Sequence, residues 1–257
     1  MDKRIGAQLY TCRKFCQTIE GLDSTMKKVS EIGYKAVQIS GVPREFTGRQ
    51  IKECADRYGL KIACTHRDFD EFTERFDETV QLHKDMDCSI AGLGALTPQA
   101  LESKENFYEF VKQADEVAEK LGECGIKFIY HNHSQEFAKL DGKTMLDYMM
   151  ENTCGNFNLV LDVYWAANAG VYPVTVMEKY AGRIPVIHYK DRKVVHWNDT
   201  DMCEIGQGVI DWDAIIDASE RTGVEWAMVE QDWGWTDDDP FKALEISYKF
   251  LTEKGFI

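Results

Sequence analysis

The chain has 257 residues, of which 44% are hydrophobic and 29% are charged, a composition typical of a folded globular protein rather than a disordered or fibrous one. Its 44 acidic and 30 basic residues give a formal net charge of -14, which repels the phosphate backbone of nucleic acids and the surface of anionic membranes. The charge therefore excludes nucleic acid and membrane surfaces as expected partners and favours a small-molecule ligand.

The cysteines and the first residues of the chain indicate the compartment. The sequence contains no CxxC pair, and most of its eight cysteines lie inside or beside apolar segments, so we expect reduced structural thiols. Met1 to Ile5 lead directly into an apolar strand without the apolar core of a signal peptide, and no apolar run is long enough to span a bilayer. These features predict a cytoplasmic protein.

Apolar runs with strand character alternate with segments of helical spacing along the whole chain. The expected strands are 5–10, 36–40, 61–66, 88–94, 125–130, 157–164, 184–189 and 226–231. The expected helices are 22–32, 47–58, 72–86, 107–121, 145–150, 174–180, 211–216 and 241–251. A polar excursion over 191–208 separates the seventh strand from its helix, and we expect it to be an active-site loop.

Eight strand-then-helix units of about 32 residues each, without a linker-like composition between them, are typical of a (β/α)8 barrel. The alternative is a doubly wound α/β sheet, which usually carries a glycine-rich phosphate turn after its first strand. The segment from Leu9 to Arg13, which follows the first expected strand, contains no GxGxxG motif. We therefore predict a single α/β TIM barrel over residues 1–257.

Four of the expected strands run into ionisable side chains. These side chains are His131, His133, Glu136, Asp162, His188 and Glu230. In a parallel α/β sheet the carboxyl ends of the strands open toward the ligand crevice, so these groups are expected to meet there. A helix cap or a satisfied polar group would explain any one of them, but the same placement on four strands favours a functional site.

The carboxylates and the imidazole of this set are typical ligands of a divalent metal ion. The expected metal ligands are Glu136, Asp162, His188 and Glu230. Their oxygen-rich composition suits Mn²⁺ first, with Mg²⁺, Co²⁺ and Zn²⁺ as alternatives. Such an ion could hold two oxygens of a hydroxy-ketone and stabilise an enediolate when the carbon between them loses its proton. The expected acid/base groups are Glu230 first, then Glu136, His133 and His131.

Further polar and aromatic side chains near the strand ends are candidates for substrate binding. They are His66, Lys190, Trp165 and Arg13. An aromatic face such as that of Trp165 can stack on the apolar face of a sugar, although core packing or a subunit interface would explain it equally well. For Lys190 the alternative is a salt bridge that orients His188, and for each histidine a structural role stays open.

Several short motifs together carry a family resemblance. They are Leu9-Tyr10, Tyr130-His131-Asn132-His133 with Glu136-Phe137, Leu161-Asp162-Val163-Tyr164-Trp165, His188-Tyr189-Lys190-Asp191, Gly206-Gln207-Gly208 with Asp211-Trp212, and Val229-Glu230-Gln231-Asp232. With them nearly the whole chain resembles the sugar phosphate isomerase/epimerase family of xylose-isomerase-like barrels. The resemblance implies a metal held by the four ligands named above. In relatives similar to ketose 3-epimerases the first glutamate lies on the strand itself, about where this sequence has His131.

These observations lead to one principal functional hypothesis and three alternatives. We expect a divalent-metal-dependent isomerase or epimerase of a sugar or keto-sugar, acting by proton transfer next to a carbonyl. A lyase or dehydratase acting on an inosose or a 3-keto-glycoside would use the same site. A non-catalytic sugar-binding subunit is the alternative of another class, and a metal-dependent endonuclease is disfavoured by the acidity. Phosphorylation of the sugar and homo-oligomerisation stay open.

Overall fold

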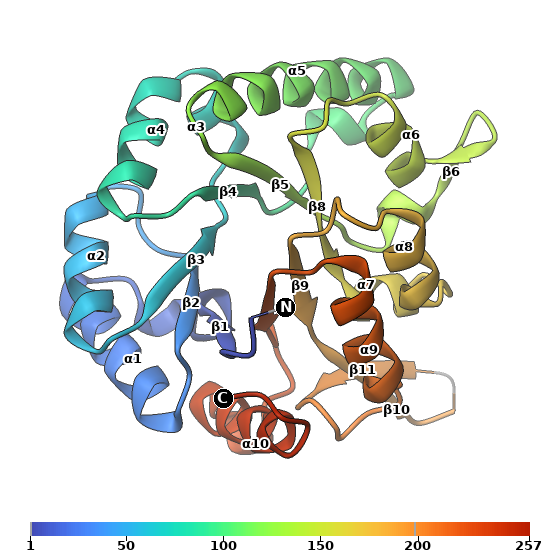
Figure 1. Ribbon diagram of the computed structural model, residues 1–257. Coiled ribbons are helices and arrows are strands. Elements are labelled where there is room, and N and C mark those ends of the chain that lie inside the picture. Colours follow the sequence, from blue (N-terminus) through green and yellow to red (C-terminus); the bar gives the residue numbers. More distant parts are fainter. Residues whose placement is uncertain (1, 198) are drawn as a thin grey trace.

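The computed structural model, which describes residues 2–197 and 199–257, contains eight parallel strands arranged as a nearly closed barrel inside a ring of helices (Figure 1). The barrel strands are β1 (Gly6–Gln8), β2 (Ala36–Ile39), β3 (Lys61–Thr65), β4 (Ile90–Leu93), β5 (Lys127–His131), β8 (Phe157–Asp162), β9 (Val186–Tyr189) and β12 (Trp226–Val229). Their order is β3-β2-β1-β12-β9-β8-β5-β4, and a parallel bridge between Arg67 and Leu93 connects the two edges. The predicted α/β barrel is confirmed.

Helices follow the strands and cover the outside of the barrel. The α-helices are α1 (Ile19–Ile32), α2 (Gly48–Arg57), α3 (Phe69–Thr73), α4 (Phe76–Asp85), α5 (Lys104–Glu123), α6 (Met145–Glu151), α7 (Val163–Asn168), α8 (Pro173–Lys179), α9 (Trp212–Thr222) and α10 (Pro240–Glu253). Short 3₁₀ turns are η1 (Leu9–Phe15), η2 (Gln99–Leu101), η3 (Gln135–Phe137) and η4 (Thr236–Asp238). A capping box of Thr47 and Gln50 opens α2, because each side chain accepts a hydrogen bond from the backbone of the other.

The apolar core has two layers because successive side chains of a strand point to opposite sides of the sheet. The inner layer fills the barrel with Ala36, Ala63, Cys64, Ile90, Ile129, Val160, Val186 and Met228. The larger outer layer lies between the strands and the helices. Gly6 leaves room for the Met228 side chain, since a Cβ at this position would lie 2.2 Å from Met228 Sδ.

Several segments differ from the sequence prediction. The strand expected to continue to 164 ends at Asp162, because its Oδ1 accepts a hydrogen bond from Trp165 N at 2.9 Å and starts α7. The helix expected over 72–86 is divided into α3 and α4. The excursion over 191–208 contains an antiparallel hairpin of β10 (Asp191–Val195) and β11 (Asp199–Cys203). A second small hairpin joins β6 (Lys139–Leu140) and β7 (Lys143–Thr144).

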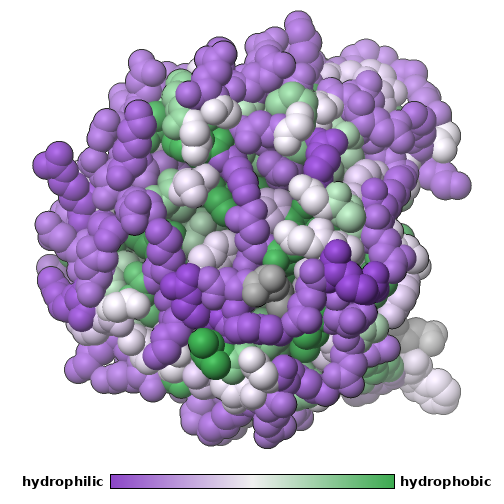
Figure 2. All heavy atoms as spheres, in the orientation of Figure 1, coloured by the Kyte–Doolittle hydropathy of each residue, from purple (hydrophilic) through white to green (hydrophobic). Residues whose placement is uncertain are grey.

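The outer surface is strongly polar. On the face drawn in Figure 2, hydrophilic residues cover the periphery, and the visible apolar residues gather toward the middle, over the barrel. Within residues 2–197 and 199–257, no helix has both the length and the apolar character needed to cross a membrane.

Candidate active site

The carboxyl ends of four barrel strands bring two imidazoles and two carboxylates together. The four residues are His131 at the end of β5, Asp162 at the end of β8, His188 in β9 and Glu230 directly after β12. One ligand atom of each lies within 4.8 Å of the others, and all four side chains are buried. The strand register produces this convergence, because Asp162 pairs with His188 across β8 and β9, and Met228 pairs with His188 across β12 and β9.

Asp162 has two differently engaged oxygens. Its Oδ1 caps α7, whereas Oδ2 points into the group and lies 3.8 Å from His188 Nδ1 and 3.9 Å from His131 Nε2. Its backbone N–H donates to Asn132 Oδ1 at 3.0 Å, which ties the end of β8 to the loop after β5. The helix cap thus fixes one oxygen of the carboxylate and leaves the other for the site.

The orientation of His188 is set by Gln38, a side chain of β2. Gln38 Oε1 lies 2.8 Å from His188 Nε2, so this nitrogen carries the proton and Nδ1 presents a lone pair. His188 Nδ1 lies only 2.8 Å from Glu230 Oε2, and neither atom makes a well-oriented hydrogen bond with any described residue. Two lone pairs at this distance repel each other unless a cation lies beside them, and the Lys190 ammonium lies 3.0 Å from Glu230 Oε2. Two imidazoles and two carboxylates whose ligand atoms converge are also a donor set that fits a divalent metal ion.

Lys190 supplies a buried positive charge beside this group. Its Nζ lies 3.0 Å from Glu230 Oε2 and 3.1 Å from both Asp162 Oδ2 and Asp232 Oδ2. Burial alone would lower the pKa of Lys190, but the three carboxylates outweigh it and hold the pKa well above its usual value. Burial alone would raise the pKa of Glu230, yet the ammonium of Lys190 holds it below the usual range. Both groups are therefore charged at neutral pH.

Three histidines form a continuous aromatic wall next to the four-residue group. The ring centroids of His66 and His131 are 5.3 Å apart, and those of His131 and His133 are 4.7 Å apart. Burial lowers the pKa of His66 to about 3 and that of His131 well below its usual value, and it also lowers the pKa of His133. All three rings are therefore neutral at pH 7 and act as hydrogen-bond partners or proton acceptors.

The structure does not bring Glu136 into the four-residue group. The Glu136 carboxylate is fully buried and accepts hydrogen bonds from Tyr130 Oη at 2.6 Å and from His133 N at 2.7 Å. These contacts fix the turn after β5 and aim His131 and His133 into the site. His131 thus lies among the metal-type donors, where the sequence prediction placed Glu136.

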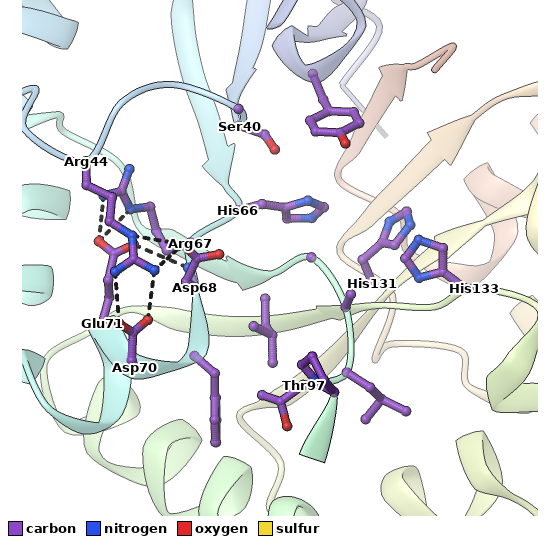
Figure 3. Close-up of a pocket in the computed structure, with 18 of the residues that line it drawn as sticks. Ser40, Arg44, His66, Arg67, Asp68, Asp70, Glu71, Thr97, His131 and His133 are labelled. Carbon is purple, nitrogen blue, oxygen red and sulfur yellow. Dashed lines mark hydrogen bonds and ion pairs between the residues drawn. The ribbon is translucent and has the colours of Figure 1, made fainter. Parts of the chain in front are cut away.

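A cavity of about 910 Å³ opens directly above the group. Three of the four predicted substrate contacts, His66, Trp165 and Lys190, line it, as does His133. Figure 3 shows His66 between His131 and His133 on one side and charged residues on the other. Arg13 is not among the described lining residues, because its guanidinium donates to the carbonyl oxygens of Tyr10 and Asp232 and stacks on the Tyr10 ring at 4.2 Å.

Two polar residues of the site escaped the sequence prediction. Asp232 lines the cavity, and burial raises its pKa to about 6 although Lys190 opposes the shift. Asp232 is the last residue of the motif Val229-Glu230-Gln231-Asp232, and its place in that motif was the signal that could have identified it. Gln38 was also missed, and its signal was an amide inside the otherwise apolar strand Ala36–Ile39.

Asp191 organises the loop that leads from the hairpin to α9. Its buried carboxylate accepts hydrogen bonds from Trp212 Nε1 at 2.7 Å and from the backbone N–H groups of Gly206 and Gly208. A Cβ at Gly208 would lie 2.2 Å from Asp191 Oδ1, so only glycine allows this approach. The motif over 206–212 is thus explained by a structural role that holds the rim of the site.

Comparisons with known proteins agree with this architecture. A family model described as xylose isomerase-like TIM barrel matches residues 26–254. Among curated relatives, rhizopine catabolism protein MocC of Rhizobium meliloti is 22% identical over an alignment 262 positions long. The alignment covers 88% of this chain and 78% of that protein. Inosose dehydratase of Lacticaseibacillus casei is 23% identical over 156 residues, which cover 54% of this chain and 50% of that protein.

Solved structures show the same fold over the full chain. A sugar phosphate isomerase/epimerase from Parabacteroides distasonis superposes with a TM-score of 0.83 at 20% identity, covering 100% of this chain and 96% of that one. L-ribulose 3-epimerase superposes with a TM-score of 0.71 at 16% identity, covering 98% and 94%. At these identities the likeness establishes the fold alone.

Proposed function

Because the chain belongs to the family of xylose isomerase-like TIM barrels, we propose that it is a divalent-metal-dependent isomerase or epimerase of a sugar or keto-sugar. The observation that carries this proposal is the convergence of His131, Asp162, His188 and Glu230 beside the buried ammonium of Lys190, at the floor of a polar cavity. Burying ionisable groups that lack hydrogen-bond partners costs folding free energy. Such groups are therefore more often found where they serve a function. This cost argues against a non-catalytic sugar-binding subunit.

The metal proposed for the site is Mn²⁺, held by two imidazoles and two carboxylates. This donor set also suits Co²⁺ and Zn²⁺, because imidazole prefers later transition metals and carboxylate prefers harder ions. When bound, the ion would act as a Lewis acid toward the carbonyl and adjacent hydroxyl oxygens of the substrate.

The residues of the chain would supply the proton transfer and the charge stabilisation. Glu230 is charged and buried, so its carboxylate is the proposed base that takes the proton from the carbon beside the carbonyl. Lys190 would stabilise the negative charge that develops on the substrate oxygen. Asp232, whose pKa is raised to about 6, would in its protonated form return a proton to the substrate carbon. Return to the opposite face gives an epimer, and return to the neighbouring carbon gives an isomer.

A dehydratase is the second candidate, favoured by the similarity to inosose dehydratase. The first step would be the same proton abstraction, and the electron pair left on carbon would expel a hydroxyl group from the adjacent carbon. Asp232 would donate a proton to that leaving hydroxyl, so water and an unsaturated ketone would form. The two reactions thus differ only in the fate of the carbanion.

Solvent deuterium incorporation tests the proposed proton transfer. Protein with its metal content measured is incubated in deuterated water with a panel of ketoses, aldoses, inososes and 3-keto-glycosides, and the recovered sugars are analysed by mass spectrometry. We expect exchange of the hydrogen beside the carbonyl of an accepted substrate, and Glu230→Gln should suppress exchange far more than it weakens binding. Product that keeps the substrate's own hydrogen, with no solvent label, would contradict the proposal and indicate a hydride shift.

A further inference from the structure

The cavity extends well beyond the group that would carry the chemistry. Its volume of about 910 Å³ lies near the upper end of the range of about 300–1,000 Å³ that ligand pockets span. Figure 3 shows that it reaches from His131 and His133 to the loops after β2 and β3. We call this distal part the outer arm, and it is lined by Val42, Arg44, Asp68, Phe69, Asp70 and Leu96. The cavity has room for more than one sugar ring.

The cations of the outer arm are already neutralised by the protein. Arg44 Nε donates to Asp68 Oδ2 at 2.9 Å, and Arg44 Nη1 donates to Asp70 Oδ2 at 2.8 Å. Behind them the buried Arg67 donates to Glu71 Oε2 at 2.5 Å and 3.0 Å. With Glu74 included, four carboxylates face two guanidinium groups along this part of the cavity. The outer arm therefore carries excess negative charge.

This arrangement is unsuited to a phosphate group. Phosphate sites in proteins use free guanidinium or ammonium groups or the N–H groups at a helix N-terminus. The helix at the outer arm, α3, begins after Asp68 and carries Asp70 and Glu71 in its first turn, so carboxylates occupy its positive end. At the other end of the cavity Lys190 is surrounded by three carboxylates. Every lysine and arginine that lines the described cavity is thus paired.

The outer arm is amphipathic in the way that a sugar ring is. Its ion pairs of Arg44 offer polar atoms that can exchange hydrogen bonds with hydroxyl groups. Apolar side chains, among them Val42, Phe69 and Leu96, line the same part of the cavity and can contact the C–H face of a ring. We propose that the outer arm is a second subsite for an uncharged sugar unit, so that the substrate is a neutral glycoside rather than a phosphorylated monosaccharide. The inference rests on the proposed function only in placing the reacting ring next to His131 and Glu230.

Calorimetric titration of the full chain loaded with Mn²⁺ tests the second subsite. The probes are D-fructose, its phosphate ester, and the neutral ketose disaccharides lactulose, maltulose and isomaltulose. We expect at least one disaccharide to bind about tenfold or more tightly than D-fructose, which corresponds to about 1.4 kcal/mol, and the phosphate ester to bind no more tightly than D-fructose. Tighter binding of the phosphate ester, or no gain for any disaccharide, would overturn the inference.

A pair of matched variants locates the binding gain. Thr73 is an exposed residue of α3 that lines the cavity next to Phe69, and its hydroxyl donates to Phe69 O. We expect the indole of Thr73→Trp to occupy space in the outer arm. Thr175 is an equally exposed residue of α8 whose hydroxyl donates to Tyr172 O, and Thr175→Trp is the control. Only Thr73→Trp should remove the disaccharide's gain, while D-fructose binds both variants as it binds the parent protein. Equal disaccharide binding by both variants would contradict the assignment.

The two proposals can fail separately. Tight binding of a disaccharide without deuterium exchange in any sugar would support the second subsite and contradict the proposed reaction. Exchange in the phosphate ester together with tight binding of that ester would support the reaction and contradict the second subsite.

Discussion

Gln38 is a polar side chain within the apolar strand β2, and its Oε1 accepts the Nε2–H of His188 at 2.8 Å. This hydrogen bond keeps the Nδ1 lone pair of His188 directed toward Asp162 and Glu230. A ligand histidine held in one tautomer in this way binds a metal more tightly, because no tautomer or ring orientation must be selected on binding. Gln38 is therefore a positioning residue for the proposed metal site.

Replacing this amide should weaken metal binding without unfolding the protein. Gln38→Leu keeps a side chain of similar size but removes the acceptor, so we expect the affinity for Mn²⁺ to fall by about 10- to 100-fold. Competition with a metal-binding dye measures this affinity, and Gln81→Leu on the exposed surface of α4 is the control. An unchanged affinity in a folded Gln38→Leu variant would show that His188 needs no such support.

The roles of His131 and Glu136 can be separated by substitution. His131→Ala removes one of the four converging donors, so we expect loss of stoichiometric Mn²⁺ after purification. Glu136→Gln should keep its metal, because the amide can still accept from His133 N and can donate to the Tyr130 hydroxyl, which is able to accept. Metal analysis of both proteins decides the question. Metal retained in His131→Ala and lost in Glu136→Gln would restore Glu136 as the ligand.

At the scale of elements, His83 joins α4 to β3. Its Nδ1 donates to Thr79 O at 2.7 Å, so Nε2 is unprotonated and accepts from Thr65 Oγ1 at 2.8 Å. Burial lowers the pKa of His83 to about 4, whereas a histidine in the unfolded chain has a pKa of about 6.5. As the pH falls, the unfolded chain takes up this proton before the folded protein does. The contribution of neutral His83 to the unfolding free energy is therefore fully present above pH 6.5 and is lost as the pH falls toward 4.

This linkage predicts an acid-sensitive contact between the two elements. Between pH 6.5 and pH 4 the native protein should lose about 3 kcal/mol of unfolding free energy through His83, following from a pKa difference of about 2.5. His83→Gln should be less stable than the parent at pH 7 but should lose less stability on acidification. Urea unfolding at several pH values measures both slopes. Parallel pH profiles for the two proteins would contradict the assignment.

The succession of strands and helices could be predicted because strands and helices have different apolar periods, and because some helices open with a capping side chain, as α2 does at Thr47. The end of β8 could not be predicted, because the residues after Asp162 are apolar and continue the pattern of a strand. Only the hydrogen bond from Trp165 N to Asp162 Oδ1 shows that the chain turns into α7 there. The β10–β11 hairpin was equally hidden, since its strands are largely polar and, within the part of the chain that the structure describes, pair with each other and not with the barrel.

At the scale of the whole molecule, parallel strands direct their carboxyl ends to one face of the barrel, so the meeting of Asp162, His188 and Glu230 could be predicted from their positions in the sequence. Their roles stay predictions. The fourth member could not be chosen in the same way, because His131, His133 and Glu136 lie within six residues of one another. In the structure the Tyr130 hydroxyl donates a hydrogen bond to the Glu136 carboxylate, and His131 is the one that joins the four-residue group.

The site also couples the whole fold to a metal ion. In the proposed metal-free state, like charges on Asp162 and Glu230 face each other across the ends of β8 and β12, with Lys190 as the neutralising group. An ion bound only by the folded protein at 100 times its dissociation constant adds about 2.7 kcal/mol to the unfolding free energy. For a chain of this length each kcal/mol raises the melting temperature by about 2–4 °C.

Chelation should therefore lower the melting temperature of the metal-loaded protein by roughly 5–10 °C, and restoring Mn²⁺ should reverse the change. His188→Ala lacks one ligand and should melt at the same temperature with and without the chelator. Differential scanning calorimetry of both proteins measures the shift. The same shift in both proteins would mean that the ion binds elsewhere. No shift in either would mean that Lys190 alone balances the buried carboxylates, and the proposed reaction would then have to proceed without a metal.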